Sequence, residues 1–389
     1  MCKIIKRGIL SGLLCLILFL TWGCTKKEES SVWEDQNISS QLVYESSMEL
    51  SYASEFRVDY YQGGYALLSV SDGNRYLVLP EGEEAPEDLD ADVQVLRKPF
   101  TNIYMVATAV MDMFYELDAL DCIRLSSQKK EGWCNEDVRE KMEEGKILYA
   151  GKYNMPDYEL ILSEGCSLAI ENNMITHSPE VIEKMKSFHI PVFIDLSSYE
   201  KHPLGRVEWV KVYGLLLGKE EEAKAIFDRQ CEIVDQIGAE ASSGKTVAFF
   251  YITSNQMVSV RNSNDYVPKM IEIAGGRYIF ENLGDENSRR SSMTMQMEEF
   301  YGKAKDADYI VYNSTIDGEL ETVHELLDKE PMLKDFKAVQ NGNVWCTTQN
   351  LYQESMSIGG MIEDFHRMLS DDPDMQKDMT YIYRLKQEE

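Results

Sequence analysis

The chain has 389 residues, 44% of them hydrophobic, and a formal net charge of −28 at pH 7. A surface this acidic repels phosphate backbones and anionic lipid headgroups, which argues against a nucleic-acid-binding protein and against membrane attachment through a basic patch. The length exceeds what a single hydrophobic core usually organises, so two domains are expected.

The first segment has the features of an export signal. Basic residues near the start are followed by an almost uncharged run over residues 8–22, which is shorter than the roughly 20 apolar residues of a membrane-spanning helix. Gly23-Cys24 at its end resembles a bacterial lipobox, although Thr21 stands where the usual pattern has Leu. We expect residues 1–23 to be removed and Cys24 to carry the acyl chains, such as palmitate, of a lipoprotein; an uncleaved anchor is the alternative.

Residues 24–47 are polar and rich in Glu, Ser, Lys and Gln, and we interpret them as a flexible tether. Three β-rich runs follow at residues 56–61, 64–70 and 75–80, separated by Gly-Gly and Asp-Gly turns. This spacing predicts an antiparallel meander at the start of the first domain.

Apolar strands then alternate with helical stretches, which predicts a parallel sheet covered by helices over residues 48–205. The predicted strands lie at residues 102–107, 146–151, 167–171 and 190–195. One predicted helix places Val110, Phe114, Leu117 and Leu120 on a single face, and another covers residues 179–187.

Residues 206–240 have no strand pattern. Their second part predicts a helix of roughly 30 Å with Ala223, Ile226 or Phe227, Ile233 and Ile237 along one side. A second alternating series occupies residues 241–389, with apolar runs at 246–252, 267–274, 307–313 and 343–346. The predicted fold class is therefore α/β, with two Rossmann-like lobes that have parallel sheets and are joined by one long helix.

Short motifs give no support for catalysis or a resident metal. Residues 239–246 match a loosened phosphate-loop pattern, but a predicted helix precedes them and a predicted strand follows, the reverse of what phosphate binding requires. Residues 88–92 begin like a calcium loop yet lack its glycine and closing Glu. The five histidines are scattered. We expect no enzyme, no cofactor and no metal site.

Cysteine usage does not indicate a disulfide framework. Five cysteines follow Cys24, an odd number without a CxxC pair, and we expect most of them to be small buried hydrophobic residues. They are Cys122, Cys134, Cys166, Cys231 and Cys346.

Four stretches resemble one known family in the order in which that family has them. They are "KILYAGKYNMPDYELILSEGCSLAI" at 146–170, "PEVIEKMKSFHIPVFI" at 179–194, "VYGLLLGKEEEAKAIFDRQ" at 212–230, and "MIEIAGGRYIFENLG" at 270–284 with "KAKDADYIVYN" at 303–313. The family is that of the solute-binding proteins of ABC importers for iron-siderophore complexes, haem and cobalamin. The chain departs from it at Gly165-Cys166-Ser167 and at Ala307, where the family often has Pro.

The resemblance implies an extracytoplasmic receptor that acts as a monomer. It would capture a metal chelate, in first place a ferric siderophore, between the lobes and deliver it to a permease dimer with its ATPase subunits. Haem or cobalamin as ligand is the alternative within this class, and a lipid-anchored enzyme or adhesion module on the same fold is the alternative from another class. An exposed Glu on each lobe docks onto the permease in the family, and these positions fall on Glu159 and on Glu299, or else Glu298.

The ligand is expected at the carboxyl ends of the parallel strands, between the lobes. An organic chelate offers flat apolar surface and anionic oxygens, which aromatic and Arg side chains recognise. The candidates are Arg97, Trp133 and Tyr153 in the first lobe and Tyr251, Arg289 and Arg290 in the second. Pairing of the two adjacent arginines with Asp285 or Glu286 is the alternative to a binding role. The alternating Met293, Met295 and Met297 suit a strand, where packing or a thioether contact to haem are both open.

Overall fold

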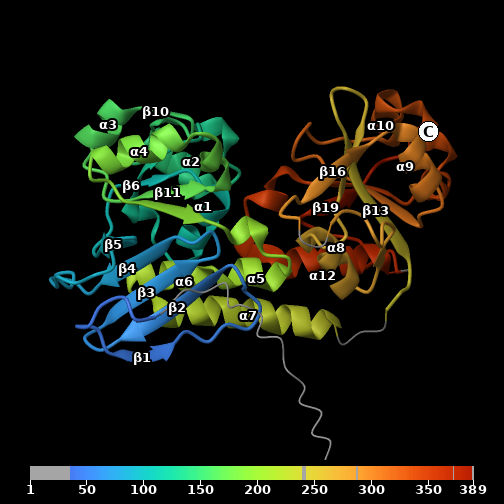
Figure 1. Cartoon of the computed structure of the whole chain (residues 1–389). Helices are drawn as coiled ribbons and strands as arrows, with labels where there is room; N and C mark the ends of the chain where they lie inside the picture. The colour runs from blue at the N-terminus through green and yellow to red at the C-terminus, as the bar shows by residue number, and fades with distance from the viewer. Residues whose placement is uncertain (1–35, 239–241, 286–287, 371, 388–389) are drawn as a thin grey trace, which may run out of the picture.

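A computed structural model describes residues 36–238, 242–285, 288–370 and 372–387. The predicted signal segment and Cys24 lie outside these ranges. The chain forms two α/β lobes with the long helix α7 between them in sequence, as predicted, and the two lobes stand side by side (Figure 1). None of the helices in the described ranges combines the length and the apolar character that a bilayer crossing requires.

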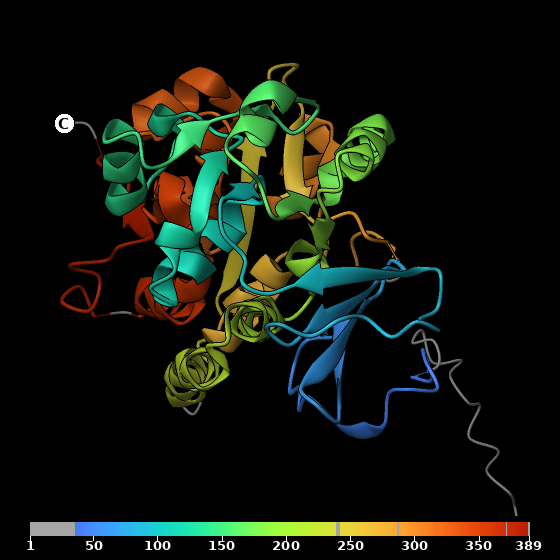
Figure 2. The same cartoon turned by 90° about the vertical axis from the view of Figure 1, so that its left-hand side faces the viewer.

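The first lobe opens with the predicted meander. Its sheet has the order β1-β2-β3-β4-β5, in which neighbours pair antiparallel except for β4 and β5, which are parallel. The strands are β1 (Tyr44–Ser47), β2 (Phe56–Tyr61), β3 (Tyr65–Val70), β4 (Arg75–Leu79) and β5 (Val93–Arg97). Figure 2, in which the first lobe faces the viewer, shows this sheet below the parallel sheet and beside the helices of the joint.

The predicted tether is wrong for residues 36–47. Ile38 is only 1% exposed and packs with Tyr61 and Leu67 in a small core on the outer face of the meander, and β1 pairs with β2. A polar run can end in a strand because the pairing partner, here β2, supplies the backbone hydrogen bonds.

As predicted, the rest of the first lobe is built on a parallel sheet. Its strand order is β12-β11-β6-β7-β8, and β7 is a strand that was not predicted from the sequence. Its strands are β6 (Ile103–Met105), β7 (Ile123–Ser126), β8 (Leu148–Tyr149), β11 (Ala169–Asn172) and β12 (Val192–Asp195). Its helices are α1 (Thr108–Glu116), α2 (Glu136–Glu143), α3 (Tyr158–Ser163) and α4 (Pro179–Ser187), and a small hairpin is formed by β9 (Gly151–Lys152) and β10 (Met155–Pro156).

Three helices form the joint: α5 (Pro203–Glu208), α6 (Val210–Leu217) and α7 (Glu220–Gly238). The predicted face of α7 is confirmed, since Ala223, Ile226, Phe227 and Ile237 are buried while Ile233 is partly buried. Buried carboxylates tie the start of the first lobe to this joint. Glu208 accepts the backbone N–H of Tyr52 at 2.8 Å, and Glu200 accepts that of Ser54 at 2.9 Å.

The second lobe has a mixed sheet where a parallel one was predicted: β13, β17 and β18 are parallel, whereas β14, β16 and β19 run antiparallel to their neighbours. Its strands are β13 (Thr246–Ile252), β14 (Val258–Arg261), β15 (Arg277–Tyr278), β16 (Ser292–Met295), β17 (Tyr309–Tyr312), β18 (Val344–Thr347) and β19 (Ile382–Arg384). Its helices are α8 (Tyr266–Ile273), α9 (Met297–Ala304), α10 (Val323–Lys329), α11 (Lys337–Gln340) and α12 (Ile358–Leu369).

The expectation that most of the cysteines after Cys24 are buried is wrong. All five cysteines that follow Cys24 are free thiols; Cys346 is buried and the other four are half-buried.

Candidate ligand-binding cleft

Three adjoining cavities lie near the joint, two of them between the lobes and one within the second lobe. The central one, of about 240 Å³, is lined by α1, α5 and Ser198 on one side and by residues of the second lobe on the other. It shares Arg261 and Tyr352 with a cavity of about 170 Å³ in the second lobe. It shares Ser198 with a cavity of about 190 Å³ at the edge of the meander. Ser291 lines all three cavities, so they form one cleft.

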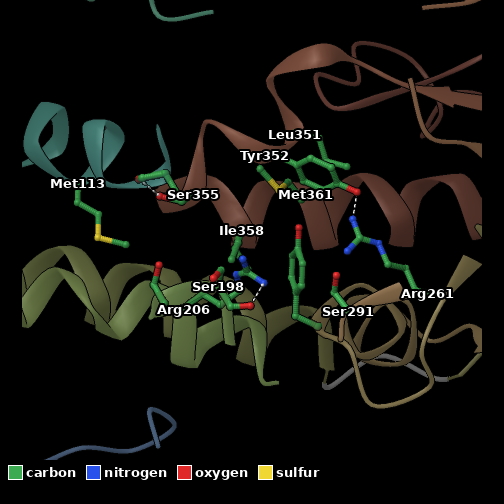
Figure 3. Close-up of a pocket in the computed structure, with 13 residues that line it drawn as sticks. Met113, Ser198, Arg206, Arg261, Ser291, Leu351, Tyr352, Ser355, Ile358 and Met361 are labelled. Atoms are coloured by element: carbon green, nitrogen blue, oxygen red, sulfur yellow. Dashed lines mark hydrogen bonds between the residues drawn. The ribbon is translucent and has the colours of Figure 1, made fainter. Parts of the chain in front are cut away.

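Two arginines from different elements converge on one aromatic ring in the central cavity. Arg206 of α5 places its guanidinium carbon 3.8 Å from the centroid of the Tyr266 ring, and Arg261, at the end of β14, lies 5.9 Å from the same centroid. Arg206 also donates to the Ser198 carbonyl at 3.4 Å. Figure 3 shows both guanidinium groups directed toward the cavity. The arrangement places two cations at the cavity, and the Tyr266 ring, which is 6% exposed, supports the Arg206 guanidinium.

The carboxylate nearest to Arg261 neutralises it only in part. Asp265 lies 3.6 Å from the Arg261 guanidinium, beyond the distance of a good charge-assisted hydrogen bond. Its side chain also caps α8 by accepting from the Val267 N–H at 3.2 Å. Burial raises the pKa of the Tyr266 hydroxyl, and the two nearby arginines act in the opposite direction. The cavity is therefore a positive site in an acidic protein.

Tyr352 and Asn313 complete the second-lobe side of the cleft. Asn313 directly follows β17, at the carboxyl end of a parallel strand, where α/β sheets present ligand-binding groups. It is 3% exposed and donates from Nδ2 to the Tyr352 hydroxyl at 3.1 Å. Arg261 donates to the same hydroxyl and lies 5.0 Å from the Tyr352 ring centroid (Figure 3).

Arg289 spans the two lobes at the meander edge of the cleft. Its guanidinium lies 3.5 Å from the Glu55 carboxylate, donates to Ser71 Oγ at 3.3 Å, and sits 4.9 Å from the centroid of the Tyr199 ring. Its neighbour Arg290 is exposed and lines the same cavity. Arg289 therefore lines the cleft while its guanidinium group also contacts side chains of the first lobe.

Of the six predicted ligand-binding residues, the structure brings three to the cleft. Tyr251 lines the second-lobe cavity and Arg289 and Arg290 line the cavity at the meander edge. All three belong to the second lobe.

The three first-lobe candidates lie elsewhere. Arg97 ends β5 on the surface, where it pairs with Glu84 at 2.9 Å. Trp133 is 3% exposed, and its indole Nε1 donates to Ser126 Oγ at 3.3 Å inside the lobe. Tyr153 is half-buried at the turn between β9 and β10, packed against the main core. None of the three lines these cavities, because their side chains are used within the first lobe.

Sequence reasoning missed the residues at the centre of the cleft: Arg206, Arg261, Tyr266, Asn313 and Tyr352. Asn313 ends the predicted strand at 307–313, so its position at a strand terminus was a usable signal. Arg206 lies in a segment interpreted as part of the joint, and Tyr352 lies in a loop without a motif, so neither carried such a signal.

Two of the three alternating methionines form a strand, as predicted, whereas Met297 is the first residue of α9. Met293 and Met295 belong to β16, where Met293 is 38% exposed and Met295 is buried. Neither of them, nor Met297, lines the three cavities. Within the described residues, no group of three or more His, Cys, Asp or Glu side chains is placed to hold a metal ion.

The predicted docking glutamates are exposed, one on each lobe. Glu159 lies in the first turn of α3, and Glu298 and Glu299 lie in the first turn of α9. Glu299 pairs with Lys303 at 2.8 Å. Both helices lie on the side of the molecule opposite α7 (Figure 1).

Comparison with known proteins agrees with this architecture. A family model described as periplasmic binding protein matches residues 103–351. Two uncharacterized lipoproteins of Methanocaldococcus jannaschii are similar to the chain. One is 26% identical over 382 residues, covering 90% of this chain and 89% of the relative. The other is 22% identical over 402 residues, covering 98% and 100%.

Solved structures show the same fold at low sequence identity. The petrobactin-binding protein of Bacillus subtilis is 12% identical with a TM-score of 0.58, covering 79% of this chain and 99% of that one. A periplasmic haem-binding protein of Vibrio cholerae is 15% identical with a TM-score of 0.55, covering 68% and 98%.

Proposed function

The chain belongs to the periplasmic binding protein family, and from this premise we propose that it is a lipid-anchored receptor of an ABC importer that captures an anionic metal chelate in the cleft. A ferric siderophore is the preferred ligand. Haem and cobalamin are the alternatives within this class. The family is one of solute-binding proteins, so a lipid-anchored enzyme or adhesion module is the less favoured reading.

The observation that carries the proposal is the pair of guanidinium groups over the Tyr266 ring. Arg206 and Arg261 create a positive, aromatic site in a protein with a formal net charge of −28. The overall charge repels anions, so an anion is held in the cleft only through local contacts. Arg donors recognise carboxylate and catecholate oxygens, and the buried Tyr266 ring holds the Arg206 guanidinium at the cavity.

Two further findings support the envelope location. The two relatives described above are named lipoproteins, and the sequence has a lipobox-like Cys24 after an export signal. Acyl chains on such a cysteine would keep the receptor near its permease, because two chains give stable anchoring.

Titration of the purified protein tests the ligand assignment. A ferric siderophore, haemin and cobalamin are added in turn, while Trp fluorescence and visible absorbance are followed. We expect the ferric siderophore to bind at micromolar concentration or below. Failure of all three ligands to bind would refute the proposal.

Variants test the role of the arginines. Arg206→Met and Arg261→Met keep most of the side-chain stem, and each should weaken siderophore binding about 10-fold or more, since each removes charge-assisted hydrogen bonds. Arg97→Met is the matched control, because Arg97 lies outside the cleft. Equal losses in all three variants would show that general charge, not the cleft, governs binding. Tight cobalamin binding that does not depend on either arginine would favour that ligand instead.

A further inference from the structure

The Tyr352 hydroxyl sits where two hydrogen-bond donors converge. Asn313 Nδ2 donates to it at 3.1 Å, and the Arg261 guanidinium donates to it as well (Figure 3). The Asn313 carboxamide is fixed in this orientation, because its Oδ1 accepts from Thr315 Oγ1 at 2.7 Å.

The Arg261 guanidinium and the fixed Asn313 carboxamide donate to the same oxygen. Such a pair of donors suits an anionic oxygen better than the neutral phenol of Tyr352. Charge-assisted hydrogen bonds to an ionised acceptor are roughly twice as strong as neutral ones. A carboxylate or catecholate oxygen of a ligand would therefore bind these donors more strongly than Tyr352 does. Tyr352 must leave for such an oxygen to enter.

The chain around Tyr352 also joins the lobes. Gln353 accepts the Cys134 N–H at 2.9 Å and donates to the Gly132 carbonyl at 2.8 Å. Ser355 Oγ donates to the Ala109 carbonyl at 2.6 Å. The Met356 N–H donates to Asp112 at 2.7 Å. We call residues 349–357 the bridging loop, because these four contacts cross from the second lobe to the first.

We propose that Tyr352 is an internal occupant of the ligand's oxygen site, and that its displacement by an anionic chelate loosens the bridging loop from the first lobe. This inference rests on the proposed function for the identity of the displacing ligand. Tyr352 thereby selects against weak acceptors, since a ligand oxygen must compete with the phenol for Arg261 and Asn313. It also connects occupancy of the cleft to the contacts between the lobes.

The link between Tyr352 and the lobes can be tested without a ligand. Tyr352→Phe removes only the hydroxyl, so hydrogen exchange of the Cys134 and Met356 amides, which donate across the lobe boundary, should become about 3- to 10-fold faster than in the wild type. Tyr65→Phe is the matched control, because it removes a hydroxyl that donates to Glu84 in the first lobe, away from the loop. Unchanged exchange of both amides in Tyr352→Phe would overturn the link.

Competition is tested with the ferric complex of 2,3-dihydroxybenzoate, a catecholate chelate. The Tyr352→Phe variant should bind it about 3- to 10-fold more tightly than the wild type, since the donors are no longer occupied. Weaker binding by the variant would identify Tyr352 as an ordinary ligand contact and overturn the competition. Absence of any chelate binding by the wild type refutes the proposed function and the competition together, whereas the amide measurement still decides the link.

Discussion

Glu171 is the residue whose environment conflicts most with its chemistry. It is the third residue of β11 and only 1% exposed. Neither of its carboxylate oxygens has a hydrogen-bond partner among the described residues. Burial raises the pKa of this carboxyl group to about 8, so the folded protein holds it in the protonated form at neutral pH.

This state makes stability depend on pH in a defined direction. The folded protein keeps the Glu171 proton up to a pKa of about 8, while the unfolded chain releases it at the ordinary pKa of a glutamate. The contribution of Glu171 to the stability of the folded protein is therefore fully present below the pKa that this carboxyl group has in the unfolded chain. It is lost as the pH rises toward 8. Glu171→Gln, which cannot ionise, should gain stability relative to the wild type between pH 5 and pH 8.5, by an amount on the order of a few kcal/mol.

Urea unfolding at pH 5, 7 and 8.5 measures this difference. Glu298→Gln is the control, because Glu298 is exposed on α9 and its substitution should leave the pH profile unchanged. Parallel profiles for Glu171→Gln and the wild type would mean that water or a local rearrangement solvates the carboxylate.

At the scale of single residues, the sequence predicted which residue types suit the ligand better than it predicted where those residues lie in the fold. Arg289 was singled out because adjacent arginines are an exception in an acidic chain, and it does line the cleft. Trp133 has equally suitable chemistry, yet its side chain points into the first lobe. Whether a side chain reaches the cleft depends on the face of the helix, strand or loop on which it lies. In loops, no sequence periodicity indicates that face.

Among the elements, α6 and α7 of the joint approach each other closely at Gly214. A Cβ atom on Gly214 would lie 2.5 Å from the Ala223 Cβ and 3.0 Å from the Lys219 carbonyl oxygen. The two helices can approach in this way because position 214 has no side chain. Gly218, which ends α6, has a φ of 70°, which reverses the chain between the two helices.

Gly214→Ala tests this packing. The added methyl group forces α6 and α7 apart, and it should destabilise the protein by about 1–3 kcal/mol, the usual range for overpacking. Gly302→Ala is the matched control, since Gly302 lies within α9 with open space around it. That change should be neutral or stabilising by about 0.5–1 kcal/mol. Equal thermal unfolding midpoints for the two variants would show that α6 and α7 accommodate the added methyl group without loss of stability.

Prediction of elements succeeded where a pattern is local and failed where pairing is distant. The buried face of α7 follows from helical periodicity and could be predicted from residues 219–238 alone. By contrast, β1 has a polar sequence with exposed side chains throughout, so only its pairing with β2 makes it a strand. Such a partner cannot be inferred from the composition of the strand itself.

At the scale of the whole molecule, the alternation of strands and helices was enough to predict two lobes and a connecting helix. The relative placement of the lobes was not predictable, because it depends on contacts such as Arg289 with Glu55 and Met356 with Asp112, between residues far apart in sequence. Residues of both lobes form the cleft. Because the placement of the lobes could not be predicted, the residues at the centre of the cleft could not be predicted either.

The last prediction concerns the face opposite α7, where Glu159 and Glu299 lie on different lobes (Figure 1). If both glutamates contact the permease, Glu159→Lys combined with Glu299→Lys should leave chelate affinity in solution unchanged but abolish chelate uptake by cells, because reversed charges repel a basic partner. Uptake of a radioactive ferric siderophore and fluorescence titration of the same variant measure the two effects separately.

Glu222→Lys provides the matched control for this face. Glu222 is an exposed glutamate in the first turn of α7, so the substitution makes the same change of charge in a similar helical position on the opposite side of the molecule. Uptake should persist in this variant. Loss of uptake in the control would point to a general effect of surface charge, and persistence of uptake in the double variant would exclude these glutamates as docking residues. Glu298→Lys and Glu299→Lys, made singly, then show which of the two neighbours on α9 contributes, since Glu299 is already engaged by Lys303.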